Sequence, residues 1–171
     1  NSAFAIDVRS AGTAELHING SLDVQAIGNG AIESTGIKTY GANNNVSIDA
    51  EKDITITSIG KNDKGSYGID SQYSDVSLEA GGNIDISATG AGKVYGIWVA
   101  GQGTKSEGKT TSVKAEGTVH IHTNMANEKA SGLLQTAGLY VQGASPNQNT
   151  EVNGNKVAIE ALGNTNGGTL Q

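Results

Sequence analysis

The sequence has no cysteine, and it has only one proline, one methionine, one tryptophan and one phenylalanine in 171 residues. Without cysteine the chain can form neither a disulfide framework nor a thiolate metal site. Lys and Arg total 11 against 17 Asp and Glu, a formal net charge of −6, and this balance argues against nucleic-acid binding because phosphate contacts need clustered cations. No apolar run approaches the length that crosses a membrane.

Three kinds of short segment with alternating apolar and polar residues follow one another in a fixed order. The first kind occupies residues 5–8, 36–39, 68–71, 96–99 and 138–141. The second occupies residues 16–20, 46–50, 76–80, 111–115 and 157–161. The third occupies residues 22–26, 54–58, 84–88 and 119–123, and a fifth copy begins at Leu170. The set repeats about every 30 residues, with longer connections in the later copies.

This repeat predicts a solenoid. Each alternating segment buries one face and leaves the other in water. A single coil of three such strands cannot cover its own apolar face, whereas stacked coils can. The alternative is a β-sandwich, but a sandwich has no reason to repeat the same three-strand set. We therefore predict an all-β parallel β-helix of about five coils with three strands per coil, formed by residues 1–171 as a single segment of a longer surface protein.

Small residues recur at two positions of the repeat and indicate corners. Glycines recur at the start of the first kind of segment, where close backbone approach or a positive φ is expected. These are Gly36, Gly68, Gly96 and Gly138. The second kind of segment ends on a small residue that lets the chain turn. These residues are Gly20, Ala50, Ala80, Ala115 and Ala161.

The set G-I-x-x, V-x-I-x-A and I-x-I-x-A, with Gly, Asn, Ser and Thr in its turns, resembles the passenger domains of type V secreted autotransporters and related large bacterial β-helical adhesins. The resemblance covers about residues 5–161. It implies a right-handed β-helix displayed at the cell surface from a Gram-negative outer membrane, and an adhesive or aggregating role. The absence of cysteine fits this route, because disulfides formed in the periplasm would trap a chain that must cross it unfolded.

Outward-facing residues at equivalent positions of successive coils form columns, and neighbouring residues within a column lie about 4.8 Å apart. The outer column of the first strand is predicted to be Asp7, Lys38, Asp70, Trp98 and Tyr140 on an exposed face. Sugars and protein surfaces dock on such exposed aromatics. The alternative to ligand binding is that Trp98 and Tyr140 stack on each other and join two coils. The segments that leave these two strands add polar residues, so the predicted ligand-binding residues are Trp98, Tyr140, Gln142 and Gln102.

Tyr67 and Tyr95 each precede a corner glycine and are predicted to stack on each other. His120 and His122 are predicted to face outward on one strand, with their rings about 7 Å apart. They could share a metal only if Asp85 of the coil below joined them, and we expect a solvated face and no metal site.

A second outer column is predicted as Asn19, Asp49, Glu79, Lys114 and Glu160. Asp49 and Glu79 would be neighbouring carboxylates of the kind that glycoside hydrolysis uses. A solvated acidic strip is the preferred interpretation, because nothing in the sequence suggests the groove that such chemistry needs.

The sequence therefore predicts an adhesin segment that binds host extracellular matrix protein, a glycan or a neighbouring bacterial cell, or that associates with its own copies. A passive β-helical stalk is the first alternative, and a polysaccharide-active β-helix enzyme is the second. We expect no catalytic activity, no cofactor, no nucleic-acid partner and no membrane insertion by this segment.

Overall fold

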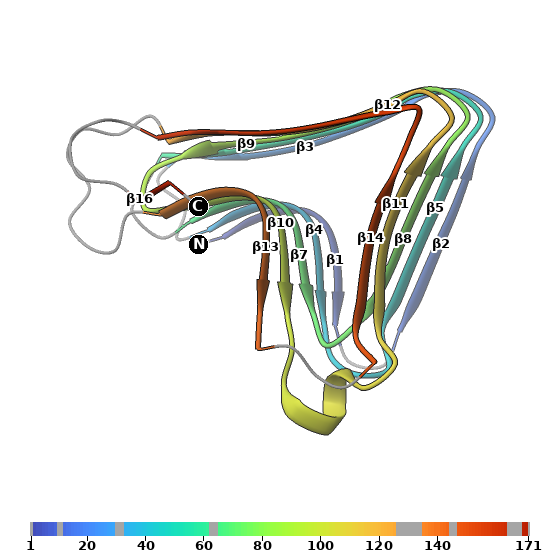
Figure 1. The fold of residues 1–171 in the computed structure, drawn as a ribbon, viewed down its shortest axis with the longest axis horizontal. Helices are drawn as coiled ribbons and strands as arrows, with labels where there is room; N and C mark the ends of the chain where they lie inside the picture. The colour runs from blue at the N-terminus through green and yellow to red at the C-terminus, as the bar shows by residue number, and fades with distance from the viewer. Residues whose placement is uncertain are drawn as a thin grey trace.

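The structure is a computed structural model that describes residues 2–9, 12–29, 33–61, 65–125, 135–143, 147–163 and 169–170. The chain forms a parallel β-solenoid with three sheets, and each coil contributes one strand to each sheet. Figure 1 shows the chain turning anticlockwise as it advances toward the viewer, so the solenoid is right-handed. The predicted fold class is confirmed. Among the described residues there is no helix with the length and hydropathy that crossing a bilayer requires.

The first sheet contains the strands β1 (Ala3–Arg9), β4 (Ser34–Tyr40), β7 (Ser66–Gln72), β10 (Lys93–Ala100), β13 (Gln135–Gln142) and β16 (Thr169–Leu170). The second sheet contains β2 (Thr13–Ile18), β5 (Asn45–Ala50), β8 (Asp75–Ala80), β11 (Thr110–Ala115) and β14 (Asn149–Asn153). The third sheet contains β3 (Leu22–Gly28), β6 (Ile54–Gly60), β9 (Ile84–Gly90), β12 (Thr118–Met125) and β15 (Lys156–Leu162). A 3₁₀ helix, η1 (Gly103–Ser106), lies between β10 and β11.

The core consists of aliphatic columns that run along the solenoid axis. In the first sheet Ile37, Ile69 and Ile97 pair in register from coil to coil, and all three are fully buried. Leu78 of the second sheet and Ile86 of the third sheet belong to the same buried cluster. Each such side chain contributes about 1.5–3 kcal/mol when it leaves water, which is why coils stabilise one another by stacking.

The first sheet is bent, as Figure 1 shows for the strands that run beside the third sheet and then turn away from it. The bend coincides with the glycine column, because Gly68 and Ile69 are adjacent and both face the core, which breaks the usual alternation. At Gly68 an added Cβ would lie 2.4 Å from Ile86 Cγ2 and 2.5 Å from the carbonyl oxygen of Gly96. The predicted close approach at this column is therefore confirmed. The bend makes the outer face of the first sheet concave (Figure 1).

On the other side of this bend, the first and third sheets meet across a thin layer of small polar side chains. Ser34 Oγ donates to the carbonyl of Ala26, and Ser58 Oγ donates to the carbonyl of Ser34, both at 2.8 Å. Thr123 and Thr136 hydroxyls are hydrogen-bonded at 2.6 Å. Hydroxyls of this size fill a gap too narrow for leucine and satisfy one another.

Three strand assignments differ from the prediction. Residues 157–161 lie in the third sheet, where Val157 pairs with Val119 and Ala161 with Thr123. The last strand of the second sheet is β14, inside the predicted connection, and β16 pairs with β13 in the first sheet instead of opening another third-kind segment. Ala161 is therefore not part of the alanine corner, whereas the pairing of Ala80 with its predicted neighbours Ala50 and Ala115 is confirmed.

The frame of β2 also differs by two residues. His17, and not Asn19, pairs with Asp49, while Leu16 pairs with Ile48. A shift of two residues leaves every side chain on the same face, so alternation alone cannot detect it.

Candidate functional site

The predicted outer column of the first sheet is confirmed in its register. Asp7 pairs with Lys38, Lys38 with Asp70, Asp70 with Trp98, and Trp98 with Tyr140. Another outer column of the first sheet lies one residue before the glycine in β4, β7, β10 and β13, and before Ala5 in β1. It contains Phe4, Thr35, Tyr67, Tyr95 and Ala137. Because the sheet bends at the glycine between them, the two columns converge on the concave side. We call the outer face on the concave side of the bend the concave groove.

Four rings pack together in the groove and form what we call the aromatic cluster: Tyr67, Tyr95, Trp98 and Tyr140. The Tyr67 ring centroid lies 5.2 Å from that of Trp98 and 5.7 Å from that of Tyr95. Tyr67 and Tyr95 are therefore in contact, but their rings are tilted by 31° and not stacked as predicted. Tyr95 stacks on Tyr140 with ring centroids 4.7 Å apart. Such offset and tilted pairs stabilise by about 0.5–1.5 kcal/mol beyond the burial of their area.

The exposure of Trp98 and Tyr140 differs from the prediction. Both are partly buried against Tyr67 and Tyr95, which are themselves buried. The physical reason is the bend, because a flat sheet would hold the two columns apart and leave the rings in water. Trp98 and Tyr140 thus have one covered face and one part open to solvent.

The polar atoms of the cluster are unequally satisfied. The Tyr95 hydroxyl donates to Gln135 Oε1 at 2.5 Å. Burial raises the pKa of both Tyr67 and Tyr95 well above the usual range, so both phenols stay neutral. Trp98 Nε1 finds no hydrogen-bond partner among the described residues.

The groove becomes charged toward the N-terminal coils. Lys38 Nζ lies 3.0 Å from Asp70 Oδ2 and 2.5 Å from Glu33 Oε1, and the Asp70 side chain is fully buried. The Gln72 amide donates to both oxygens of Asp70, at 3.0 and 2.9 Å. Burial raises the pKa of Asp70 to about 6, although the Lys38 ammonium acts to lower it. Burial by itself would lower the Lys38 pKa, but the two carboxylates together raise it.

Beside this ion pair the groove opens into a hollow of about 340 Å³, lined by Ser2, Phe4, Arg9, Glu33, Lys38 and Tyr40. The Lys38 ammonium and the Arg9 guanidinium each lie 5.1 Å from the centre of the Phe4 ring. Both cations are therefore held over an aromatic face. The groove as a whole passes from this charged hollow to the aromatic cluster.

The two predicted glutamines are exposed at the end of the groove. Gln142 lies two residues beyond Tyr140 on β13, and its carbonyl accepts a hydrogen bond from the Gly101 amide at 2.7 Å. Gln102 begins the loop to η1, where its side-chain oxygen accepts from Lys105 Nζ at 3.1 Å. The structure thus places Trp98 beside Tyr140, with Gln142 next along the strand and Gln102 on the adjoining loop.

Sequence reasoning did not assign Tyr67, Tyr95 or the Lys38–Asp70 pair to this site. Strict alternation would place the two columns on opposite faces, because they are three residues apart, and it does not reveal the bend that brings them to the same face. The signal in the sequence was the glycine between each aromatic and the next outward residue, as at Gly68 between Tyr67 and Asp70.

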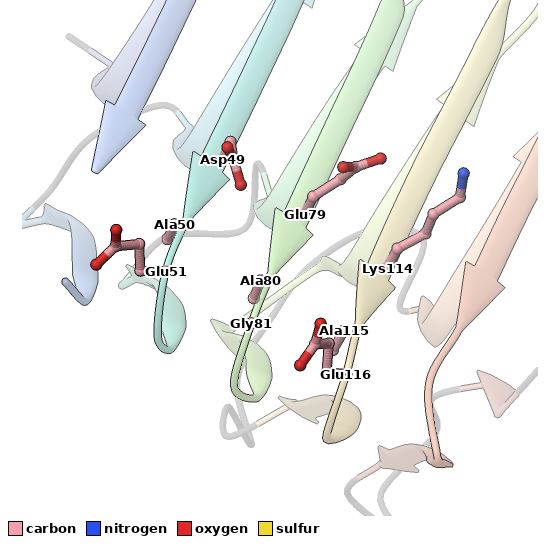
Figure 2. Close-up of a pocket in the computed structure, with 9 residues that line it drawn as sticks. All are labelled: Asp49, Ala50, Glu51, Glu79, Ala80, Gly81, Lys114, Ala115 and Glu116. Carbon is pink, nitrogen blue, oxygen red and sulfur yellow. The ribbon is translucent and has the colours of Figure 1, made fainter. Parts of the chain in front are cut away.

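Another hollow, of about 370 Å³, lies where the second sheet turns toward the third (Figure 2). Asp49 and Glu79 pair on neighbouring strands, as predicted, and Lys114 is next to Glu79. Figure 2 shows the Glu79 side chain extending away from Asp49, toward the strand that carries Lys114. The two carboxylates do not converge on one point, as the two carboxyl groups of a glycoside hydrolase must. Glu160 lies on β15 of the third sheet and is not part of this column.

Comparison of the chain with protein-family models, curated proteins and solved structures found no match. The resemblance to β-helical passenger domains therefore depends on the repeated three-strand set, and the structure supports it at the level of the β-solenoid fold.

Proposed function

We propose that this chain is the recognition segment of a bacterial cell-surface adhesin, displayed from a Gram-negative outer membrane, and that it binds an extended glycan in the concave groove. The observation that carries the proposal is the aromatic cluster on the concave side of the first sheet. The fold supports the adhesin part of the proposal through its resemblance to β-helical passenger domains.

The chemistry of the groove suits a sugar chain. Pyranose rings present C–H faces that pack on partly exposed rings such as Trp98 and Tyr140. These two rings rest on buried Tyr67 and Tyr95, so little side-chain freedom is lost when a ligand binds. The exposed amides of Gln142 and Gln102 supply donors and acceptors for hydroxyl groups.

The direction of the groove favours a chain over a single sugar. Equivalent side chains repeat at about 4.8 Å per coil along the axis, so several coils offer several subsites. The charged hollow near Lys38 and Arg9 would then contact the more polar part of the ligand.

Trp98 is the single tryptophan of the chain and reports on the site directly. A glycan and matrix-protein array probed with the chain should identify a ligand, and titration of that ligand should change the Trp98 fluorescence. We expect Tyr140→Ala to weaken binding at least tenfold, because it removes one of the two open rings. Gln142→Ala should weaken it several-fold without affecting folding, because this side chain is exposed. Trp98→Ala, followed on the array, should behave like Tyr140→Ala.

Gln25→Ala is the matched control for Gln142→Ala, because Gln25 is an exposed glutamine on β3 of the third sheet, outside the concave groove. A ligand that binds the Tyr140→Ala and Gln142→Ala variants as tightly as the unchanged chain would overturn the proposed site. If the chain bound only matrix proteins, the adhesin function would stand, but the proposal that its ligand is a glycan would be refuted. Sedimentation of the chain as a concentration-dependent oligomer would favour self-association instead.

The second candidate is a stalk that projects another domain. One observation favours it: the last coil presents exposed Val157, Ile159 and Leu162, an apolar end on which further coils could stack. A well-folded chain that bound nothing on the array would support the stalk.

A further inference from the structure

Two histidines and an aspartate come together on the outer face of the third sheet, away from the concave groove. His120 and His122 lie two residues apart on β12. Asp85 on β9 pairs with His120, and Glu160 on β15 pairs with His122. The four side chains therefore come from three successive coils.

The two imidazoles lean together instead of standing apart. Their ring centroids are 4.6 Å apart and the rings are stacked within 17°, which is closer than the separation expected along a strand. Asp85 Oδ1 lies 3.4 Å from His120 Nδ1 and 3.2 Å from His122 Nε2. The three atoms all lie within 4.8 Å of one another.

The two separations from Asp85 Oδ1 match those between the ligand atoms of a metal site. A tetrahedral zinc ion binds nitrogen and oxygen at about 2.0–2.1 Å, which places its ligand atoms about 3.3 Å apart. Asp85 Oδ1 is covered by its surroundings, and although the two imidazole nitrogens lie within ion-pair distance, no described residue makes a hydrogen bond to it. A covered carboxylate oxygen without a donor is unfavourable, and a cation between it and the two nitrogens would satisfy it.

Glu160 occupies the position of a supporting carboxylate. Its Oε1 lies 3.7 Å from His120 Nε2, the ring nitrogen that is not directed at Asp85. Histidines that bind metals commonly donate their other N–H to a carboxylate, which fixes the tautomer and the ring orientation. Here that contact would leave Nδ1 of His120 free to bind the ion.

We propose that Asp85, His120 and His122 form a site for a divalent transition-metal ion, with zinc as the fitting probe. Two imidazole nitrogens and one carboxylate oxygen suit zinc, whereas calcium prefers six to eight oxygen ligands. Three protein ligands leave the fourth position to water or to a donor from a bound partner. The partial exposure of both histidines gives the ion access from solvent. Because its two strands belong to adjacent coils, the ion would also link β9 to β12.

The test is calorimetric titration of zinc chloride into the full chain at neutral pH. We expect one ion per chain with micromolar affinity. His122→Gln and Asp85→Asn should each weaken it at least tenfold, and Glu160→Gln should weaken it by about tenfold through His120. All three side chains are partly exposed, so these variants should fold.

His17→Gln is the matched control, since His17 is the remaining histidine and lies on the second sheet, 3.8 Å from Asp49. It should leave zinc affinity unchanged, and calcium chloride should give no heat. In ¹⁵N spectra of the imidazoles, zinc should shift Nδ1 of His120 and Nε2 of His122. The absence of zinc binding, equal affinity in the Asp85→Asn and His122→Gln variants, or loss of binding in His17→Gln would each overturn the proposal.

Discussion

In the coils from β4 onward the bend of the first sheet has glycine at its inner side, although β1 has Ala5 there, and Gly68→Ala tests whether the stacked coils require glycine. The new Cβ would lie 2.4 Å from Ile86 Cγ2 and 2.5 Å from the Gly96 carbonyl oxygen. Carbon atoms in contact prefer about 3.5–4.0 Å, so the neighbours would have to move by about 1 Å. Ile86 is fully buried, and the Gly96 carbonyl belongs to a paired strand of the next coil. Neither can yield without disturbing the stack.

Overpacking of a dense core costs about 1–3 kcal/mol, and a clash with backbone on one side puts this variant at the upper end or beyond it. We expect the free energy of unfolding to fall by about 3 kcal/mol, which corresponds to a drop in Tm of roughly 6–12 °C for a chain of this size. Urea unfolding followed by circular dichroism measures the first quantity, and a thermal scan measures the second.

Gly20→Ala is the matched control, because an added Cβ there meets no heavy atom within 4 Å. Its effect should stay within about 0.5 kcal/mol. Ile86→Ala removes one of the two clashing groups, so the double variant with Gly68→Ala should lose less stability than the sum of the single variants. Equal stability of Gly68→Ala and Gly20→Ala, or strict additivity with Ile86→Ala, would refute the steric explanation of the bend.

Two further predictions concern buried polar groups. The Asn44 side chain is buried; it accepts a hydrogen bond from the Gly12 amide at 2.9 Å and donates to the carbonyls of Val8, at 3.1 Å, and of Tyr40. Asn44→Ala should therefore lower the free energy of unfolding in urea by about 3 kcal/mol. Asn45→Ala is the control and should have little effect, because Asn45 is exposed. The pKa of Asp70 is about 6 in the folded state and 3.8 ordinarily, so the folded state binds this proton more tightly than the unfolded state. The stability that the protonated Asp70 contributes is therefore full below pH 3.8 and is lost as the pH rises through 6. Relative to Asp70→Asn, the unchanged chain should thus lose up to about 3 kcal/mol between pH 4 and pH 7. A difference that does not vary with pH, or that grows in the opposite direction, would contradict the burial argument.

The proposed sites lie on different sheets, which makes them separable by experiment. The concave groove belongs to the first sheet, and the histidines belong to the third. We expect His122→Gln to leave glycan binding unchanged and Tyr140→Ala to leave zinc binding unchanged. A change in either cross-test would show that the two faces are coupled through the core.

The sequence was sufficient where a strong local pattern repeated without interruption. The alternation of Ile37, Ile69 and Ile97 with polar residues determined which face is buried and aligned the first strands of all five coils. The glycine before each of these residues indicated a close backbone approach, and the structure shows that approach at Gly68. Alternation and small residues act locally, so they can be read without knowing the fold.

Local patterns did not determine the register of every strand. Residues 157–161 alternate in the same way as both the second and the third kind of segment, and only their pairing with β12 decides between the two sheets. In β2 a frame shift of two residues kept the same face buried and moved His17 beside Asp49. Such choices depend on hydrogen bonds between coils about 30 residues apart and on the length of the connections, neither of which a period of two records.

Curvature was decided only by the tertiary structure. Tyr67 and Asp70 are three residues apart, so strict alternation would place them on opposite faces of the sheet. The bend at Gly68 breaks the alternation, turns both side chains to the concave side and buries an aspartate that a flat sheet would expose. The approach of His120 and His122 to one oxygen of Asp85 likewise requires two coils in register and two rings that lean together. Within each straight part of a strand, the sequence determined which face a side chain takes, because side-chain direction follows from the strand period. The bend and the stacking of coils decided which side chains meet and which are buried.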